Sequence, residues 1–148
     1  MTRSELTDKI VAAKRKQKLT WSGLAEKIGH GSAIVTTAAL LGQMRLTEEE
    51  ATNAARLLGL DEEERALLTE VPYRGSLPPG PPTDPLIYRF YELVTVYGTT
   101  WKALIEEEFG DGIMSAIDFD MTMERQPDPK GDRVRISMSG KFLPYKRY

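Results

Sequence analysis

Two stretches in the second half of the chain carry residue types that could bind a small anion. Arg89 and Glu92 lie three residues apart, so on a helix they share one face. Aromatic side chains surround them and could shield them in part from water: Tyr88, Phe90, Tyr91 and Tyr97. The planar fork of an arginine suits a carboxylate-shaped anion. The spacing therefore indicates either an anion-binding arginine held by a carboxylate or an ordinary surface ion pair, worth about 0.3–0.5 kcal/mol.

A serine follows a glycine-containing loop further along. Ser115 comes three residues after Gly112, the last residue of the sequence Gly110-Asp111-Gly112. Such a serine either caps a helix or turn, or offers its hydroxyl to an anion. A nucleophilic role is not indicated, because the chain has no Gly-x-Ser-x-Gly sequence and His30 is the sole imidazole.

Composition removes several other kinds of chemistry. The chain has no cysteine and one histidine, which excludes disulfides, thiolate catalysis and nearly every zinc site, although not carboxylate-bound magnesium or calcium. His30 stands between two glycines and is predicted to be a turn residue. No apolar run approaches the roughly 18 residues of a membrane span, and no signal peptide is evident. A cytoplasmic location with no membrane partner is therefore expected.

The first 71 residues are predicted to form a bundle of short helices. Thr20, the pair Thr47 and Glu50, and the pair Asp61 and Glu64 are helix-capping patterns. Glycines follow at the expected ends, and the first helix finishes in a cluster of cations, which suits its dipole. Short helices joined by glycine-containing turns predict a helix-turn-helix-like arrangement.

This arrangement raises the possibility of DNA binding, which the charges do not favour. A recognition helix needs cations for phosphates and polar side chains for base edges. Residues 32–41 contain no lysine, arginine or asparagine, and the whole chain has a net charge of -2. The bundle is therefore predicted not to bind nucleic acid.

Residues 72–85 hold most of the nine prolines and are predicted to be an extended linker. Residues 86–148 are then expected to form a small domain for catalysis and dimerisation. Its elements are a helix from Pro85 that ends at Gly98, a second helix over 100–109, and a β-hairpin whose strands alternate over 117–124 and 134–138. A lone hairpin is marginal, so a second subunit is expected to cover it. The fold class is α+β.

The sequences of residues 88–92, 97–100 and 109–117 resemble those of the cyanase (cyanate hydratase) family. The resemblance extends over residues 9–144 and is densest over 82–119. It implies a lyase that decomposes cyanate, with bicarbonate as co-substrate, to ammonia and carbon dioxide through carbamate. Such an enzyme detoxifies cyanate and supplies nitrogen. It needs no metal or organic cofactor.

The resemblance also implies the site and the assembly. Arg89, Glu92 and Ser115 match the family's active-site residues, with Ser115 as an anion-binding hydroxyl. Whether Glu92 orients Arg89 or carries a proton stays open. Intertwined dimers would form a homodecamer with active sites between subunits, and the Lys146-Arg147-Tyr148 end could alter its contacts. The rival interpretations are a helix-turn-helix regulator and an inert oligomeric scaffold.

Overall fold

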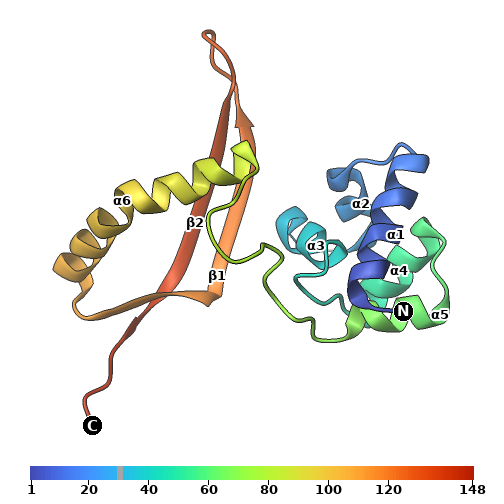
Figure 1. The fold of residues 1–148 in the computed structure, drawn as a ribbon, viewed down its shortest axis with the longest axis horizontal. Coiled ribbons are helices and arrows are strands. Elements are labelled where there is room, and N and C mark those ends of the chain that lie inside the picture. Colours follow the sequence, from blue (N-terminus) through green and yellow to red (C-terminus); the bar gives the residue numbers. More distant parts are fainter. Residues whose placement is uncertain (30–31) are drawn as a thin grey trace. The chain divides into compact units, whose positions relative to one another are not determined.

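The computed structural model describes residues 1–29 and 32–148, which form two compact units, residues 1–76 and 77–148 (Figure 1). The prediction for His30 lies outside the described residues. The α+β class is confirmed, since the described ranges contain six helices and one two-stranded antiparallel sheet. Within those ranges, no helix is both long enough and apolar enough to cross a membrane.

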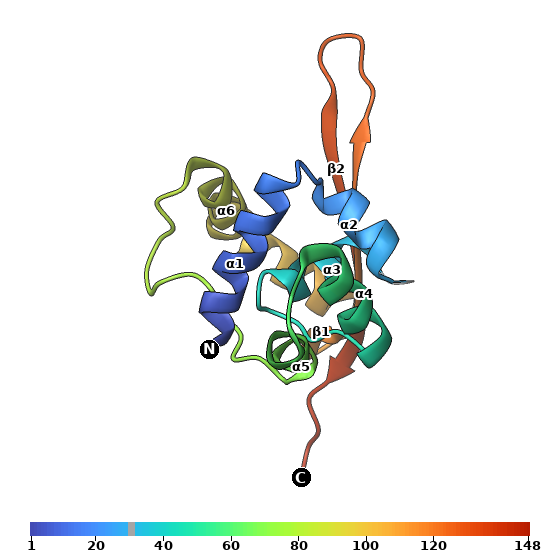
Figure 2. The ribbon, with the colours of Figure 1, turned by 90° about the vertical axis from the view of Figure 1, so that its right-hand side faces the viewer.

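The first unit packs five helices around one core: α1 (Arg3–Lys16), α2 (Trp21–Ile28), α3 (Ala33–Leu40), α4 (Glu48–Leu58) and α5 (Glu62–Thr69). Figure 2 shows these helices in blue to green. Leu6, Leu24 and Leu40 are fully buried at its centre. The remaining core members are small or aliphatic side chains from every helix and from the loop before α4: Ile10, Ile28, Ala39, Leu46, Ala51, Ala54, Leu58 and Leu68.

The helix caps of this unit agree with the prediction. Thr20 accepts a hydrogen bond from the backbone N–H of Gly23, and reciprocal capping boxes begin α4 and α5. Gly59 ends α4 with a positive φ of 68°, a conformation that suits glycine. These signals lie within four residues of the backbone groups they satisfy, which is why sequence alone reveals them.

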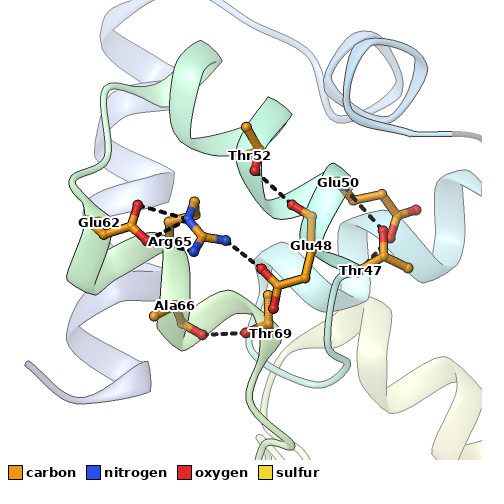
Figure 3. A network of polar contacts seen from close by, with 8 residues as sticks. All are labelled: Thr47, Glu48, Glu50, Thr52, Glu62, Arg65, Ala66 and Thr69. Carbon is orange, nitrogen blue, oxygen red and sulfur yellow. Dashed lines mark hydrogen bonds and ion pairs between the residues drawn. The ribbon is translucent and has the colours of Figure 1, made fainter.

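Charged side chains join the surfaces of α4 and α5 (Figure 3). The Arg65 guanidinium donates to Glu62 on its own helix and to Glu48 on α4, at a shortest distance of 2.6 Å in each case. The hydrogen bonds from Arg65 lower the pKa of Glu62, and those carboxylates raise the pKa of Arg65. The network ties two helix N-termini together on an exposed face.

One carboxylate of the first unit is buried. Glu64 is 2% exposed, and its two oxygens lie 2.5 and 2.7 Å from the Lys9 ammonium of α1. The same side chain accepts from the backbone N–H of Asp61 in the capping box of α5. Glu64 therefore both forms an ion pair with Lys9 and helps to cap α5.

The second unit consists of α6 (Pro85–Phe109), β1 (Gly112–Gln126) and β2 (Arg133–Pro144) (Figure 1). The predicted helix end at Gly98 is wrong, because α6 continues through it. A glycine inside a helix destabilises it by only about 1 kcal/mol relative to alanine. Because helix propagation is cooperative, the long helical segments on both sides of Gly98 outweigh this cost. The end of α6 is held to the hairpin by Phe109, whose ring stacks on Phe142 at 5.3 Å.

This unit has almost no core of its own. None of the residues of α6, all of which the structure describes, is buried. In residues 77–148, Ser115 is the one buried residue. Large apolar side chains of α6 and both strands are exposed instead, among them Leu86, Val94, Leu104, Ile117, Met123 and Val134.

Candidate active site

The start of α6 fixes the place of Arg89. Asp84 caps the helix by accepting from the backbone N–H groups of Leu86 and Ile87, both at 2.9 Å, and Pro85 occupies the first turn, as predicted. Arg89 lies one turn further on, where its Nε donates to the carbonyl of Pro85 at 3.3 Å. The capped first turn thus orients the guanidinium as well as the helix.

Arg89 and Glu92 form the ion pair that their spacing predicts. Arg89 Nη1 donates to Glu92 Oε2 at 2.9 Å, and the guanidinium carbon lies 5.4 Å from the ring centre of Tyr88. The aromatic shielding is weaker than expected, since the Arg89 and Glu92 side chains are 61% and 45% exposed in the single chain. Nη2 of Arg89 makes no hydrogen bond within the described ranges, which leaves donors of the fork available to an anion.

Ser115 caps no helix and lies in a strand, where its side chain makes the local hydrogen bonds of a serine that caps a turn. Strand β1 begins at Gly112, before the predicted start at 117, and Ser115 lies in a bulge of that strand. Met114 pairs with Phe142 and Phe119 with Gly140, so residues 115–118 face Lys141 alone. A bulge interrupts the two-residue alternation that marks a strand, which is why the sequence pattern predicted strand only after it.

The bulge directs the hydroxyl of Ser115. Its Oγ accepts from the backbone N–H of Ile117 at 3.0 Å and of Asp118 at 2.9 Å, and the residue is 4% exposed. These N–H groups belong to the part of β1 that has no one-to-one pairing with β2. The serine hydroxyl therefore accepts hydrogen bonds from backbone donors that β2 does not pair.

Of the three predicted residues, Arg89 and Glu92 are joined directly in the single chain. Among the described residues, no hydrogen bond or ion pair connects Ser115 to Arg89 or Glu92. A hollow of about 300 Å³ between α6 and β1 is lined by Trp101, Ile105 and other residues, but by none of these three. In the described ranges no three histidine, cysteine, aspartate or glutamate side chains group as metal ligands would.

The sequence interpretation did not include Gly140, which faces the Ser115 bulge from β2. A glycine inside an alternating strand pattern often marks a bulge or a close backbone approach. That signal was present in the sequence Ser139-Gly140-Lys141.

Comparison with known proteins covers both units. Residues 3–72 match the family model described as "Cyanate hydratase, N-terminal", and residues 79–147 match "Cyanate lyase C-terminal domain". Proteins named cyanate hydratase from Dechloromonas aromatica (strain RCB) and Ralstonia pickettii (strain 12J) are 66% and 64% identical over 148 residues, the full length of each chain. A crystal structure of cyanase from T. urticae is 37% identical, with a TM-score of 0.77 over 94% of this chain and 96% of that one.

Proposed function

The chain belongs to the cyanate hydratase (cyanase) family, and from that membership we propose that it decomposes cyanate with bicarbonate. The proposal rests on the full-length identity to proteins named cyanate hydratase. One cyanate and one bicarbonate with two protons give one ammonia and two carbon dioxide molecules. Bicarbonate adds to the cyanate carbon, the adduct loses carbon dioxide to leave carbamate, and protonated carbamate splits into ammonia and the second carbon dioxide.

The main physical obstacle is the meeting of two anions. At about 4 Å and an effective dielectric constant near 20, they repel by about 4 kcal/mol. Arg89 supplies a cation with donors in a planar fork, oriented by Pro85 and Glu92. Holding both anions close together in the reactive orientation lowers the activation barrier further. Glu92 either keeps Arg89 in place or carries a proton, and Ser115 donates to one of the anions. Neither a metal nor an organic cofactor takes part.

The proposed assembly is a homodecamer of intertwined dimers, with sites between subunits. It is supported by the apolar surface of α6 and the hairpin, which a single chain leaves exposed. It is also consistent with the lack, among the described residues of one chain, of any hydrogen bond between Ser115 and the ion pair. Sharing sites would let more than one Arg89 face each pocket and offset two substrate charges. The proposed location is the cytoplasm, where the enzyme would remove cyanate and supply nitrogen.

The rival functions have less support. A DNA-binding regulator needs cations on its recognition helix, whereas α3 carries no lysine or arginine. An inert scaffold gives no reason for the full-length identity to proteins named cyanate hydratase.

The deciding measurement is ammonia release from cyanate, with and without rigorous removal of bicarbonate. We expect release to depend on both anions and to be inhibited by oxalate, a dianion that imitates the combined adduct. Release that continues unchanged without bicarbonate rules out the two-anion reaction. Light scattering of the same sample should give a particle many times 16.6 kDa, and a fully active monomer rules out shared sites.

A further inference from the structure

The hydrogen bonds of the Ser115 hydroxyl occupy its acceptor sites and leave its donor. A hydroxyl has two lone pairs and one hydrogen. Both lone pairs of Ser115 Oγ are engaged, by the N–H groups of Ile117 and Asp118. The hydrogen must then point in the remaining tetrahedral direction, and throughout the described residues it is donated to no protein acceptor. Ser115 is therefore set up to donate and has no lone pair free for nucleophilic attack.

The two backbone hydrogen bonds also make this hydroxyl a stronger hydrogen-bond donor. Hydrogen bonds accepted by an oxygen polarise its O–H, so the next bond in the chain becomes stronger. An anion is the partner that benefits most from a polarised donor. The arrangement is fixed before any ligand arrives, because it depends on the backbone of the bulge. It is thus the kind of preorganised donor that stabilises charge during a reaction.

Gly140 decides whether the bulge can hold this shape. A Cβ added at Gly140 would lie 2.3 Å from the carbonyl oxygen of Ser115, 2.7 Å from Met114 Cγ and 3.3 Å from Phe119 Cδ2. The flexible Met114 side chain could move away, whereas the Ser115 carbonyl is backbone of the bulge itself. Any side chain at position 140 would therefore displace the residues that aim the hydroxyl.

We propose that Gly140 is a positioning residue for the reaction, because its missing side chain lets β2 approach the bulge that holds Ser115 as a preorganised, donor-only hydroxyl. The proposal rests on the proposed function, in which Ser115 donates to a substrate anion. Gly140 itself touches no substrate. Its contribution reaches the reaction through Ser115 alone, and this makes it separable from a general contribution to folding.

A double-mutant cycle on the assembled enzyme tests this separability. Ser115→Ala and Gly140→Ala should each lower kcat/KM by about 10²-fold, the usual effect of losing one preorganised donor. The double variant Ser115→Ala/Gly140→Ala should be no worse than Ser115→Ala, since the donor can be lost only once. Two losses that multiply would overturn the proposal, as would a Gly140→Ala enzyme with unchanged kcat/KM. Gly98→Ala is the matched control, because its added methyl group meets only Val94 Cγ1 at 3.6 Å, an ordinary contact.

Hydrogen exchange gives a readout that does not depend on activity. In the unaltered, assembled protein the amides of residues 117 and 118 should be protected by Ser115 Oγ, and Gly140→Ala should lose this protection. Rapid exchange of these two amides in the unaltered protein overturns the proposal even if no variant assembles. If no ammonia is released from cyanate but the amides are protected, the proposed function fails while the geometry of the bulge stands.

Discussion

Two leucines on helices of the same chain lie in opposite surroundings. Leu24 of α2 is fully buried among the helices of the first unit, whereas Leu104 of α6 is 59% exposed in the second. The first unit completes its core with its own side chains. The second unit leaves large apolar side chains of its helix and strands uncovered by its own residues, and it also carries the three candidate site residues. Stability and the proposed chemistry are thus assigned to different halves.

The largest effect is expected when the two units are produced as separate fragments. A fragment of residues 1–76 should fold as a monomer, because its core is complete. A fragment of residues 77–148 should keep its helix only while self-associated and lose it on dilution. Circular dichroism and sedimentation over a range of concentrations check both. A stably helical monomer of the second fragment would contradict the comparison.

Two leucine-to-alanine substitutions, one in each unit, test the same contrast in the whole protein. Leu24→Ala should lower the free energy of unfolding by about 2–5 kcal/mol at every protein concentration, since it opens a cavity in a closed core. Leu104→Ala should act through assembly, so its effect on thermal unfolding should grow as the protein is diluted. Calorimetry at several concentrations distinguishes them. A concentration-independent effect for Leu104→Ala would mean that no partner covers this side chain.

Two ion pairs on α6 allow a matched test of the candidate site. Arg89 pairs with Glu92, and Lys102 pairs with Glu106, both on exposed faces of the single chain. Arg89→Lys keeps the charge but replaces the planar fork, and should lower the rate by about 10²-fold at saturating bicarbonate. Glu92→Gln should also be severely impaired, while Glu106→Gln should be nearly silent.

Assembly must be checked first by light scattering, so that rate and oligomer size are not confused. Near-normal turnover of Arg89→Lys would reduce this arginine to a nonspecific charge. An equally impaired Glu106→Gln enzyme would mean that the site is misplaced.

The smallest expected effect concerns the surface network of the first unit. Hydrogen bonds from Arg65 lower the pKa of Glu62, so the folded state favours the ionised carboxylate. The stabilisation should be present above the unfolded pKa of about 4.3 and should disappear as the pH falls through the lower folded value. The stability difference between the unaltered protein and Glu62→Gln should follow this course in denaturant titrations from pH 7 to pH 3. A difference that increases on acidification would show that Arg65 does not hold this carboxylate.

What the sequence could predict depends on how local each signal is. The capping boxes at Thr47 and Asp61 are confirmed because side chain and backbone partners lie within one helical turn. The end predicted at Gly98 is wrong because the cost of one glycine is small beside the continuity of a 25-residue helix. The position of Ser115 depends on how β1 pairs with β2, which lies some 25 residues later in the sequence. A local sequence pattern carries no information about that pairing. Its place among the candidate residues came from the family resemblance and stays a prediction.

The ion pair between the buried Glu64 and the half-exposed Lys9 restricts the order in which substitutions can accumulate. Losing Lys9 first would leave a buried carboxylate without its cation, one of the costlier states for a folded chain. Replacing Glu64 by glutamine first would remove the charge yet keep an oxygen for the backbone N–H of Asp61. Lys9 is 43% exposed and could then turn to water. Lineages that dispense with this ion pair should therefore pass through glutamine at position 64 before they change position 9.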